Sequence, residues 1–395
     1  MASTSLPAAR PAEIGLSEEG LRRLSAAFTR EIESKRLPGM VALLARRGRV
    51  GFVESLGMRD PKSGTKMSAD TIFRIYSMTK PIVSVATMML VEEGRLMLGD
   101  PLSKFVPAFA MPKVAVEVGG KVELLAAARE ITIQDLLRHT SGLIYEFRGA
   151  GAVYKRYSEA NIARRDQTNA DHAATLATMP LAFHPGSRWE YGRSTDVVGR
   201  VLEVIAGKPL GEILAERVIH PLGMVDTGFH VSASELQRVA EAFDKDPDTG
   251  EAVSLLDPHE PPMFQSGGGG LFSTAQDVAR FALMLQSGGA LGGVRLLGRK
   301  TVAFMTSDHL GAIPGVEVMT GPGFGFGLGF AVRLADGLAM SAGSVGQYYW
   351  GGIAGTVFWV DPREELVAVL LTQAPGQREY YRALFRNLVY AALAD

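Results

Sequence analysis

Several features that would narrow the chemistry are missing from this chain. It contains no cysteine, which excludes disulfide bonds, thiolate zinc sites and a cysteine nucleophile. It also has no excess of charge, because 41 basic and 42 acidic side chains leave a net charge of −1. We therefore expect no nucleic acid partner, since nothing in the overall charge attracts a polyanion.

Long hydrophobic runs are absent as well. The apolar stretch at 82–91 reaches about half the length of a bilayer span, and two glutamates follow it directly. No apolar segment follows the arginine within residues 1–11, so no secretory signal is visible. From these absences we expect a cytoplasmic protein with no membrane partner.

What is present is the composition of an ordinary globular protein. Apolar residues make up 47% of the chain and charged residues 21%. The 395 residues exceed the roughly 250–300 at which a single core stops growing, so we expect more than one domain.

Apolar periodicity predicts strands near both ends of the chain and helices in its middle. An amphipathic helix is expected over 16–34, with Ser17 as its N-cap, and a β-hairpin with strands at 40–45 and 50–56. The later predicted elements are helices at 133–138, 173–179, 195–206 and 210–218, a helix capped by Ser273 that runs to residue 285, strands at 327–332, 354–360 and 366–372, and a closing helix over 378–393.

One antiparallel sheet that joins the strands of the two chain ends is the simplest α/β (α+β) arrangement of these elements. It predicts a sheet domain made of residues 1–71 and 265–395, with the terminal helices packed on it. Residues 72–264 would then form an inserted, mainly helical domain. We expect the active site in the cleft between the two domains.

The search for catalytic motifs leaves one candidate nucleophile. There is no H-E-x-x-H, no P-loop and no G-x-S-x-G. The S-x-x-K signature occurs twice, at Ser77–Lys80 and Ser63–Lys66. Ser63 lies in a polar segment that contains glycine, whereas Ser77 begins a helix that is apolar nearly all round and therefore buried. This difference favours Ser77.

The chemistry of a serine nucleophile needs this placement. Ser77 and Lys80, three positions apart on a helical turn, face the same side. Burial of Lys80 in an apolar helix favours its neutral form, which can accept the serine proton. The free N–H groups at the helix start can bind an oxyanion. The alternative interpretation is a serine cap followed by a lysine whose stem covers apolar surface.

Five segments in order carry a resemblance to a known family. They are 73–81 around Ser77, L-L-R-H-T-S-G-L at 136–143, P-G at 185–186 followed by Tyr191, P-L-G-M at 221–224, and G-G-G-L-F-S-T-A-Q-D at 268–277. Over about residues 16–392 the chain resembles the serine β-lactamase/penicillin-binding protein superfamily. It is most similar to the class C β-lactamase-like branch that contains the family VIII carboxylesterases. The resemblance implies a β-lactamase/transpeptidase-like fold.

The resemblance also implies roles for individual residues. Ser77 would be the acylated nucleophile, Lys80 would share its proton, and Tyr191 would be the second base. The backbone N–H groups of Ser77 and Ile353 would form the oxyanion hole. Tyr145 would line the substrate pocket.

The segment Trp350-Gly351-Gly352 stands where β-lactamases carry K-T-G. The Y-x-N motif is replaced by Tyr191-Gly192-Arg193, and the one K-[ST]-G of the chain, 62–64, precedes the nucleophile. Replacing lysine by Trp350 removes the cation that would pair with a β-lactam carboxylate.

Both departures fit the esterase branch, which prefers short acyl esters. The aromatic residues Tyr348, Tyr349 and Trp350 would form a substrate-binding wall for uncharged apolar groups. We therefore expect a carboxylesterase that acts on a small-molecule ester without a metal or cofactor.

Other functions remain open at this point. The same site suits a β-lactamase, including weak β-lactamase activity, a D-amino-acid peptidase, an amide hydrolase or a transacylase. A non-catalytic scaffold of the same fold is the alternative of another class. Arg193 is a candidate for the missing carboxylate-binding cation.

Overall fold

An antiparallel sheet built from both ends of the chain organises the molecule. The computed structural model describes residues 5–118 and 121–395. Within these residues the main sheet has eight strands. Their order is β10 (Phe324–Phe326), β11 (Ala331–Arg333), β12 (Tyr348–Gly351), β13 (Val357–Asp361), β14 (Leu366–Thr372), β1 (Gly39–Arg46), β2 (Arg49–Asp60) and β3 (Thr65–Lys66).

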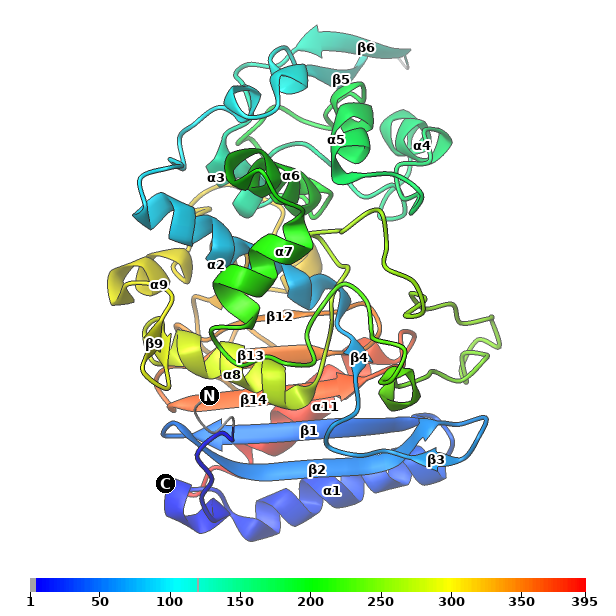
Figure 1. Ribbon diagram of the computed structural model, residues 1–395, viewed down its shortest axis with the longest axis vertical. Helices are drawn as coiled ribbons and strands as arrows, with labels where there is room; N and C mark the ends of the chain where they lie inside the picture. The colour runs from blue at the N-terminus through cyan, green and yellow to red at the C-terminus, as the bar shows by residue number, and fades with distance from the viewer. Residues whose placement is uncertain (1–4, 119–120) are drawn as a thin grey trace.

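The first and last long strands lie side by side at the centre of this sheet. β1 pairs antiparallel with β14, with Leu43 opposite Val369 (Figure 1). Side chains of β1 alternate between the two faces, Val41 and Leu43 on one and Met40 on the other. Both faces are covered, which explains why β1 and β14 are continuous apolar runs.

Helices cover both faces of the sheet. The terminal helices α1 (Glu18–Glu33) and α11 (Arg378–Tyr390) share one buried cluster with β1, β13 and β14, in which Phe28, Trp359 and Phe385 are fully buried. Helix α8 (Ala275–Gln286) packs on the other face, against β1, β13 and β14. The expected packing of the terminal helices on a joint sheet is confirmed.

The hairpin between β1 and β2 turns through two residues. Arg47 and Gly48 both have positive φ, 54° and 72°. Two such residues are what a type I′ turn requires, and this turn matches the twist of the strands. The turn places the strand ends at Arg46 and Arg49, close to the expected ends.

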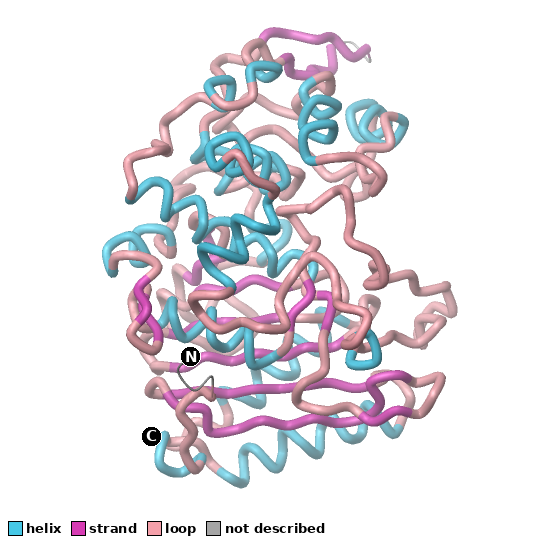
Figure 2. Tube along the Cα trace, viewed as in Figure 1, coloured by secondary structure: helices cyan, strands magenta, loops and turns pink. Residues whose placement is uncertain are grey.

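The middle of the chain forms a helical body beside the sheet. Figure 2 shows helices and loops above the strands of the main sheet. The helices are α2 (Thr79–Glu92), α3 (Ile133–Leu137), α4 (Ala152–Glu159), α5 (Asn169–Ala177), α6 (Ser194–Ala206), α7 (Leu210–Leu214), the π-helical turn Ala215–Ile219, α9 (Arg299–Met305) and α10 (Glu317–Thr320). Among the described residues, short strand pairs also lie outside the main sheet. They are β4 (Phe73–Arg74) with β7 (Phe272–Ser273), β5 (Lys113–Val118) with β6 (Lys121–Ala126), and β8 (Ala290–Leu291) with β9 (Val294–Arg295). The remaining short helices are 3₁₀ turns at Pro11–Ile14, Tyr76–Met78, Leu102–Lys104, Pro107–Phe109 and Leu236–Arg238.

Some sequence expectations about these elements were wrong. Only residues 331–332 of the expected strand at 327–332 belong to a strand, β11. Residues 327–330 form a bend between β10 and β11, where a Cβ on Gly327 would lie 2.3 Å from the carbonyl oxygen of Met305. The N-cap of α8 is Thr274, whose hydroxyl accepts the N–H of Asp277, and Ser273 belongs to β7 instead. The β5–β6 hairpin interrupts the region expected to be mainly helical. The division of the chain into domains at residues 72 and 264 stays a prediction.

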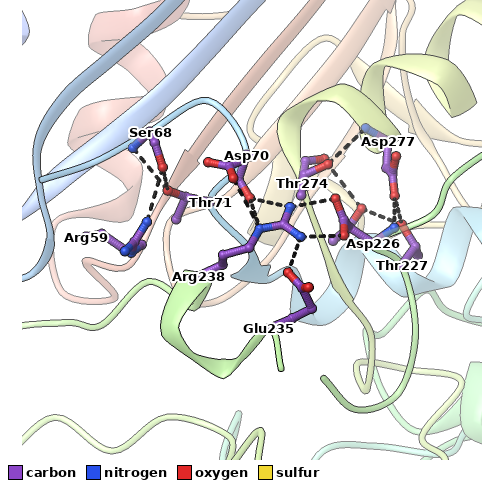
Figure 3. Close-up of polar contacts among 11 residues, drawn as sticks. Arg59, Ser68, Asp70, Thr71, Asp226, Thr227, Glu235, Arg238, Thr274 and Asp277 are labelled. Atoms are coloured by element: carbon purple, nitrogen blue, oxygen red, sulfur yellow. Dashed lines mark hydrogen bonds and ion pairs between the residues drawn. The ribbon is translucent and has the colours of Figure 1, made fainter. Parts of the chain in front are cut away.

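A polar network ties the segment before β4 to the middle of the chain. Figure 3 shows the guanidinium of Arg238 between Asp70, Asp226 and Glu235. Arg238 donates to the backbone oxygen of Asp70 at 2.7 Å and to the carboxylates of Asp226 and Glu235 at 2.7 and 2.6 Å. The chain is therefore held in place just before it enters β4.

No helix in the described part of the chain combines the length and apolar character needed to cross a membrane.

Candidate active site

Ser77 lies in a 3₁₀ turn between β4 and α2. The residue before it, Tyr76, has a φ of 43°, which is uncommon for a bulky side chain. Two contacts hold this conformation: the N–H of Leu256 donates to the Tyr76 hydroxyl at 2.9 Å, and Ile75 N–H donates to the Leu271 oxygen at 3.0 Å. The strained turn presents Ser77 at the wall of a cavity.

Lys80 follows one turn later and is fully buried. Its ammonium group lies 3.4 Å from Ser77 Oγ, 3.0 Å from the Tyr145 hydroxyl and 2.5 Å from the Gly268 backbone oxygen. Each of the three ammonium hydrogens thus has an acceptor. The serine and lysine of the S-x-x-K motif face each other as expected.

The charge of Lys80 differs from the expectation. Burial lowers the pKa of a lysine, but the neighbouring groups of Tyr145, Tyr191 and Asp196 more than offset this effect and raise the pKa of Lys80 above its ordinary value. The direction of this shift argues against the expected neutral lysine. The sequence pattern showed the apolar surroundings but not the three oxygen-bearing groups.

Asp196 contacts Lys80 indirectly, through the backbone of Gly268, and sequence reasoning missed this residue. Its carboxylate accepts the Gly268 N–H at 2.9 Å and the Ser266 hydroxyl at 2.5 Å. Gly268 in turn offers its carbonyl oxygen to Lys80. The available signal was an aspartate on the apolar face of the helix predicted at 195–206, since buried carboxylates need partners.

Two tyrosines flank Lys80. The ring centroid of Tyr191 lies 4.5 Å from Lys80 Nζ, and the Tyr191 hydroxyl accepts the indole N–H of Trp350 at 3.3 Å. Tyr145, expected only as a pocket wall, lines the cavity and also contacts Lys80 through its hydroxyl. Burial raises the pKa of Tyr145 to about 12, although Lys80 opposes the rise, so Tyr145 stays a phenol at neutral pH.

The Trp350-Gly351-Gly352 segment ends β12 next to the nucleophile turn. A Cβ on Gly352 would lie 2.3 Å from the backbone oxygen of Ile75, so only glycine allows this approach. The Ile353 N–H has no hydrogen-bond partner among the described residues, and Ile353 is 43% exposed at the cavity wall. The segment thus offers a free backbone donor at the cavity that Ser77 lines.

The cavity has a volume of about 710 Å³, within the range of small-molecule sites. Its walls include Ser77, Tyr145, Tyr191, Tyr349 and Trp350. Tyr348, expected in the same aromatic wall, is buried against Phe330 with ring centroids 5.3 Å apart. The aromatic wall therefore consists of Tyr349 and Trp350 from the three expected side chains, together with Tyr145 and Tyr191.

Arg193 lines the cavity, but its charge is already compensated. Its guanidinium donates to Glu146 at 2.6 Å, lies 3.9 Å from the Asp196 carboxylate and stacks 4.8 Å from the Tyr145 ring centroid. This engagement argues against the expected role as a carboxylate-binding cation.

Across residues 5–118 and 121–395, no three His, Asp or Glu side chains gather closely enough to hold a metal ion.

An antiparallel sheet flanked by helices, with an S-x-x-K pair at the start of a buried helix beside it, defines the class of molecule: a serine hydrolase of the β-lactamase/transpeptidase fold. A family model described as Beta-lactamase matches residues 24–392. The chain belongs to the beta-lactamase family.

Known relatives lead towards the esterases of this family. Esterase EstB of Burkholderia gladioli is 34% identical over 390 residues, which cover 93% of this chain and 95% of that protein. Protein Rv1367c of Mycobacterium tuberculosis is 36% identical over 347 residues, with coverage of 85% and 86%. The solved structure of EstCE1, described as a hydrolase with promiscuous acyltransferase activity, matches with a TM-score of 0.80 and 28% identity, covering 94% of this chain and 99% of that one. The resemblance to the family VIII esterase branch is confirmed, and the protein is an enzyme of the serine hydrolase superfamily.

Proposed function

We propose that this protein hydrolyses short-chain carboxylic esters through an acyl-enzyme on Ser77. The observation that carries the proposal is Ser77 Oγ at the wall of an aromatic cavity, 3.4 Å from the buried Lys80 ammonium. The likeness to Esterase EstB and to EstCE1 supports ester hydrolysis.

In the proposed mechanism Tyr191 reacts as its phenolate. Ser77 Oγ attacks the ester carbonyl while the phenolate oxygen accepts the serine proton and becomes a phenol. The Lys80 ammonium, next to both groups, stabilises the negative charge that moves between them. The oxyanion binds to the N–H groups of Ser77 and Ile353. When the intermediate collapses, the C–O bond to the alcohol breaks and the alcohol leaves with the proton held by Tyr191. Water, deprotonated by the same residue, then hydrolyses the acyl-enzyme.

The environment of Trp350 favours esters over β-lactams. Where a lysine would offer a cation, the indole N–H instead holds the Tyr191 hydroxyl. An aromatic side chain at this place binds apolar groups and gives nothing to a carboxylate. The cavity is large enough for a short acyl group and a larger alcohol together.

The test compares the two S-x-x-K serines. Ser63 is the matched control, because it is exposed and its hydroxyl contacts only polar groups of its own surface loop, among them Asp60 and Thr65. Ser77→Ala should lower the turnover of 4-nitrophenyl butyrate by about a thousandfold or more, whereas Ser63→Ala should retain it. A fluorophosphonate probe should label the wild type and Ser63→Ala but not Ser77→Ala.

Two outcomes would overturn the proposal. Fast turnover of a chromogenic cephalosporin with little ester turnover would identify a β-lactamase. A folded wild-type protein that reacts with neither esters nor the probe would identify a scaffold.

Acyl transfer is a second candidate, favoured by the cavity volume and by the description of EstCE1. An added alcohol should then divert the acyl group from water to a new ester, detected by chromatography.

A further inference from the structure

The charged residues that line the cavity are strongly biased. They comprise six arginines and one carboxylate, Glu379, although the whole chain carries a net charge of −1. Such a concentration of one sign in a walled cavity focuses the field and attracts ligands of the opposite charge.

Four of the six arginines are engaged by the protein. Arg193 pairs with Glu146, and both Arg378 and Arg382 contact Glu379 at 3.3 and 2.9 Å. Arg386 donates to the side-chain oxygen of Gln347 at 3.1 Å and stacks on Trp359. These four side chains build the cavity wall and have little binding capacity to spare.

The other two, Arg148 and Arg165, differ from them. Neither guanidinium has a carboxylate partner or a hydrogen bond within the part of the chain that the structure describes, and both side chains are exposed. Arg148 lies 5.7 Å from the ring centroid of Tyr191. Arg165 lines the same cavity as Tyr76 and Ser77, so both arginines lie at the cavity of the proposed reaction.

The electrostatic surroundings of Arg165 point the same way. Desolvation lowers the pKa of Arg165, the carboxylate of Asp196 opposes this effect, and the charge of Arg193 adds to it. A guanidinium that remains charged under these conditions gains from an anionic ligand.

We propose that the enzyme prefers esters that carry a carboxylate, and that Arg148 and Arg165 bind this carboxylate. The proposal rests on the proposed ester hydrolysis and names its substrate class. These two arginines would supply the positive charge that the lysine of K-T-G supplies in β-lactamases and that Trp350 does not. Both arginines lie in loops, outside the family motifs. A planar guanidinium can hold a carboxylate through two parallel hydrogen bonds, which gives orientation as well as affinity.

The carboxylate can belong to the acyl or to the alcohol part, and paired substrates separate these cases. For the acyl part the pair is mono-4-nitrophenyl adipate and 4-nitrophenyl hexanoate. For the alcohol part it is 4-acetoxybenzoate and 4-acetoxybenzamide. The quantity compared is the ratio of kcat/KM for the anionic and the uncharged ester of each pair.

In the wild type we expect this ratio to exceed one for at least one pair and to fall with added salt, because salt screens the attraction. Arg148→Gln and Arg165→Gln should each lower the ratio by about tenfold, mainly through KM. Arg363→Gln, at an exposed arginine in the β13–β14 turn, is the matched control and should leave the ratio unchanged.

Equal ratios in the wild type and in both cavity variants, with no effect of salt, would overturn the inference while leaving ester hydrolysis intact. Loss of the proposed function looks different, because no ester of either pair would then be turned over. In that event calorimetry with adipate on the wild type still decides: heat of binding that Arg148→Gln and Arg165→Gln abolish supports the carboxylate site, and its absence overturns it.

Discussion

At the scale of single residues, the unusual feature is one ammonium group shared by two tyrosines. Tyr145 binds Lys80 directly and is held as a phenol by a pKa of about 12. Tyr191 lies under the same ammonium and is oriented by Trp350. The hydroxyl of Tyr145 is thus occupied by a direct hydrogen bond to Lys80, whereas Tyr191 meets the ammonium group with its ring, so we expect the two tyrosines to have different tasks.

This difference predicts unequal losses on removal of each hydroxyl. Tyr191→Phe should lower kcat for 4-nitrophenyl butyrate by about 10²–10⁴-fold, the usual contribution of a general base. Tyr145→Phe removes one hydrogen bond to a charged group and should cost about tenfold. Steady-state kinetics of both variants measure the two losses.

Tyr157 supplies the control. It is fully buried outside the cavity and bonds the Pro180 carbonyl oxygen, so Tyr157→Phe should leave kcat unchanged. A larger loss in Tyr145→Phe than in Tyr191→Phe would reverse the assignment of the base.

At the scale of elements, two helices begin with the same local motif in different surroundings. Helices α3 and α5 both start with a capping box, Thr132 with Asp135 and Thr168 with Asp171. Asp171 is exposed, whereas the buried Asp135 also accepts a hydrogen bond from Thr140 at 2.8 Å. Thr140 belongs to the H-T-S-G-L segment, so Asp135 holds that segment as well as the helix end.

Acid should therefore act on α3 more than on α5. Burial opposes ionisation of Asp135, but its partners, first among them Arg129, lower the pKa to about 2 from an ordinary value of 3.8. A lowered pKa stabilises the fold above pH 3.8, and this contribution is lost as the pH falls towards 2. Asp135→Asn should lower the free energy of unfolding at pH 7 by about 2 kcal/mol and reduce its dependence on acid.

Urea unfolding at pH 7 and pH 3 measures this effect. Asp171→Asn, which removes the same cap without the buried partners, should have a much smaller effect. Equal losses in the two variants would show that the cap itself, and not the buried contacts of Asp135, stabilises α3.

Elements with strong periodicity were predictable and short ones were not. The strand at 366–372 was predicted with the bounds that β14 has, because buried β-branched runs are unambiguous. The β5–β6 hairpin was missed although the sequence carried its signal, because Gly119-Gly120, a pair typical of tight turns, stands between the runs 113–118 and 121–126. In the site, Ser77 and Lys80 followed from a motif on a buried helix. The hydrogen bond between Tyr145 and Lys80, and the neutralisation of the Arg193 charge by Glu146, could not be predicted because only the fold brings these residues together.

At the scale of the whole molecule, segments far apart in sequence meet around Arg238 and the start of α8. Figure 3 shows Asp277 beside Thr227 and Asp226, on the far side of Asp226 from Arg238. The Asp277 carboxylate accepts the N–H of Asp226 at 2.8 Å and the hydroxyl of Thr227 at 2.9 Å. This contact joins the helix that covers the sheet to the chain segment leading towards Arg238.

The ionisation of Asp277 sets a limit on the stability of this junction. Burial raises the pKa of Asp277 to about 6, although the two hydrogen bonds oppose the rise. Because the pKa is raised in the fold, protonated Asp277 stabilises the fold relative to the ionised form. This stabilisation is complete below pH 3.8 and is lost as the pH rises through 6. Asp277→Asn keeps an acceptor and cannot ionise, so between pH 4 and pH 8 the free energy of unfolding of the variant should rise relative to the wild type by about 2 kcal/mol. Urea unfolding of both proteins across this range measures the difference. A difference that stays constant with pH would mean that Asp277 is already ionised at pH 4 and that its hydrogen bonds outweigh its burial.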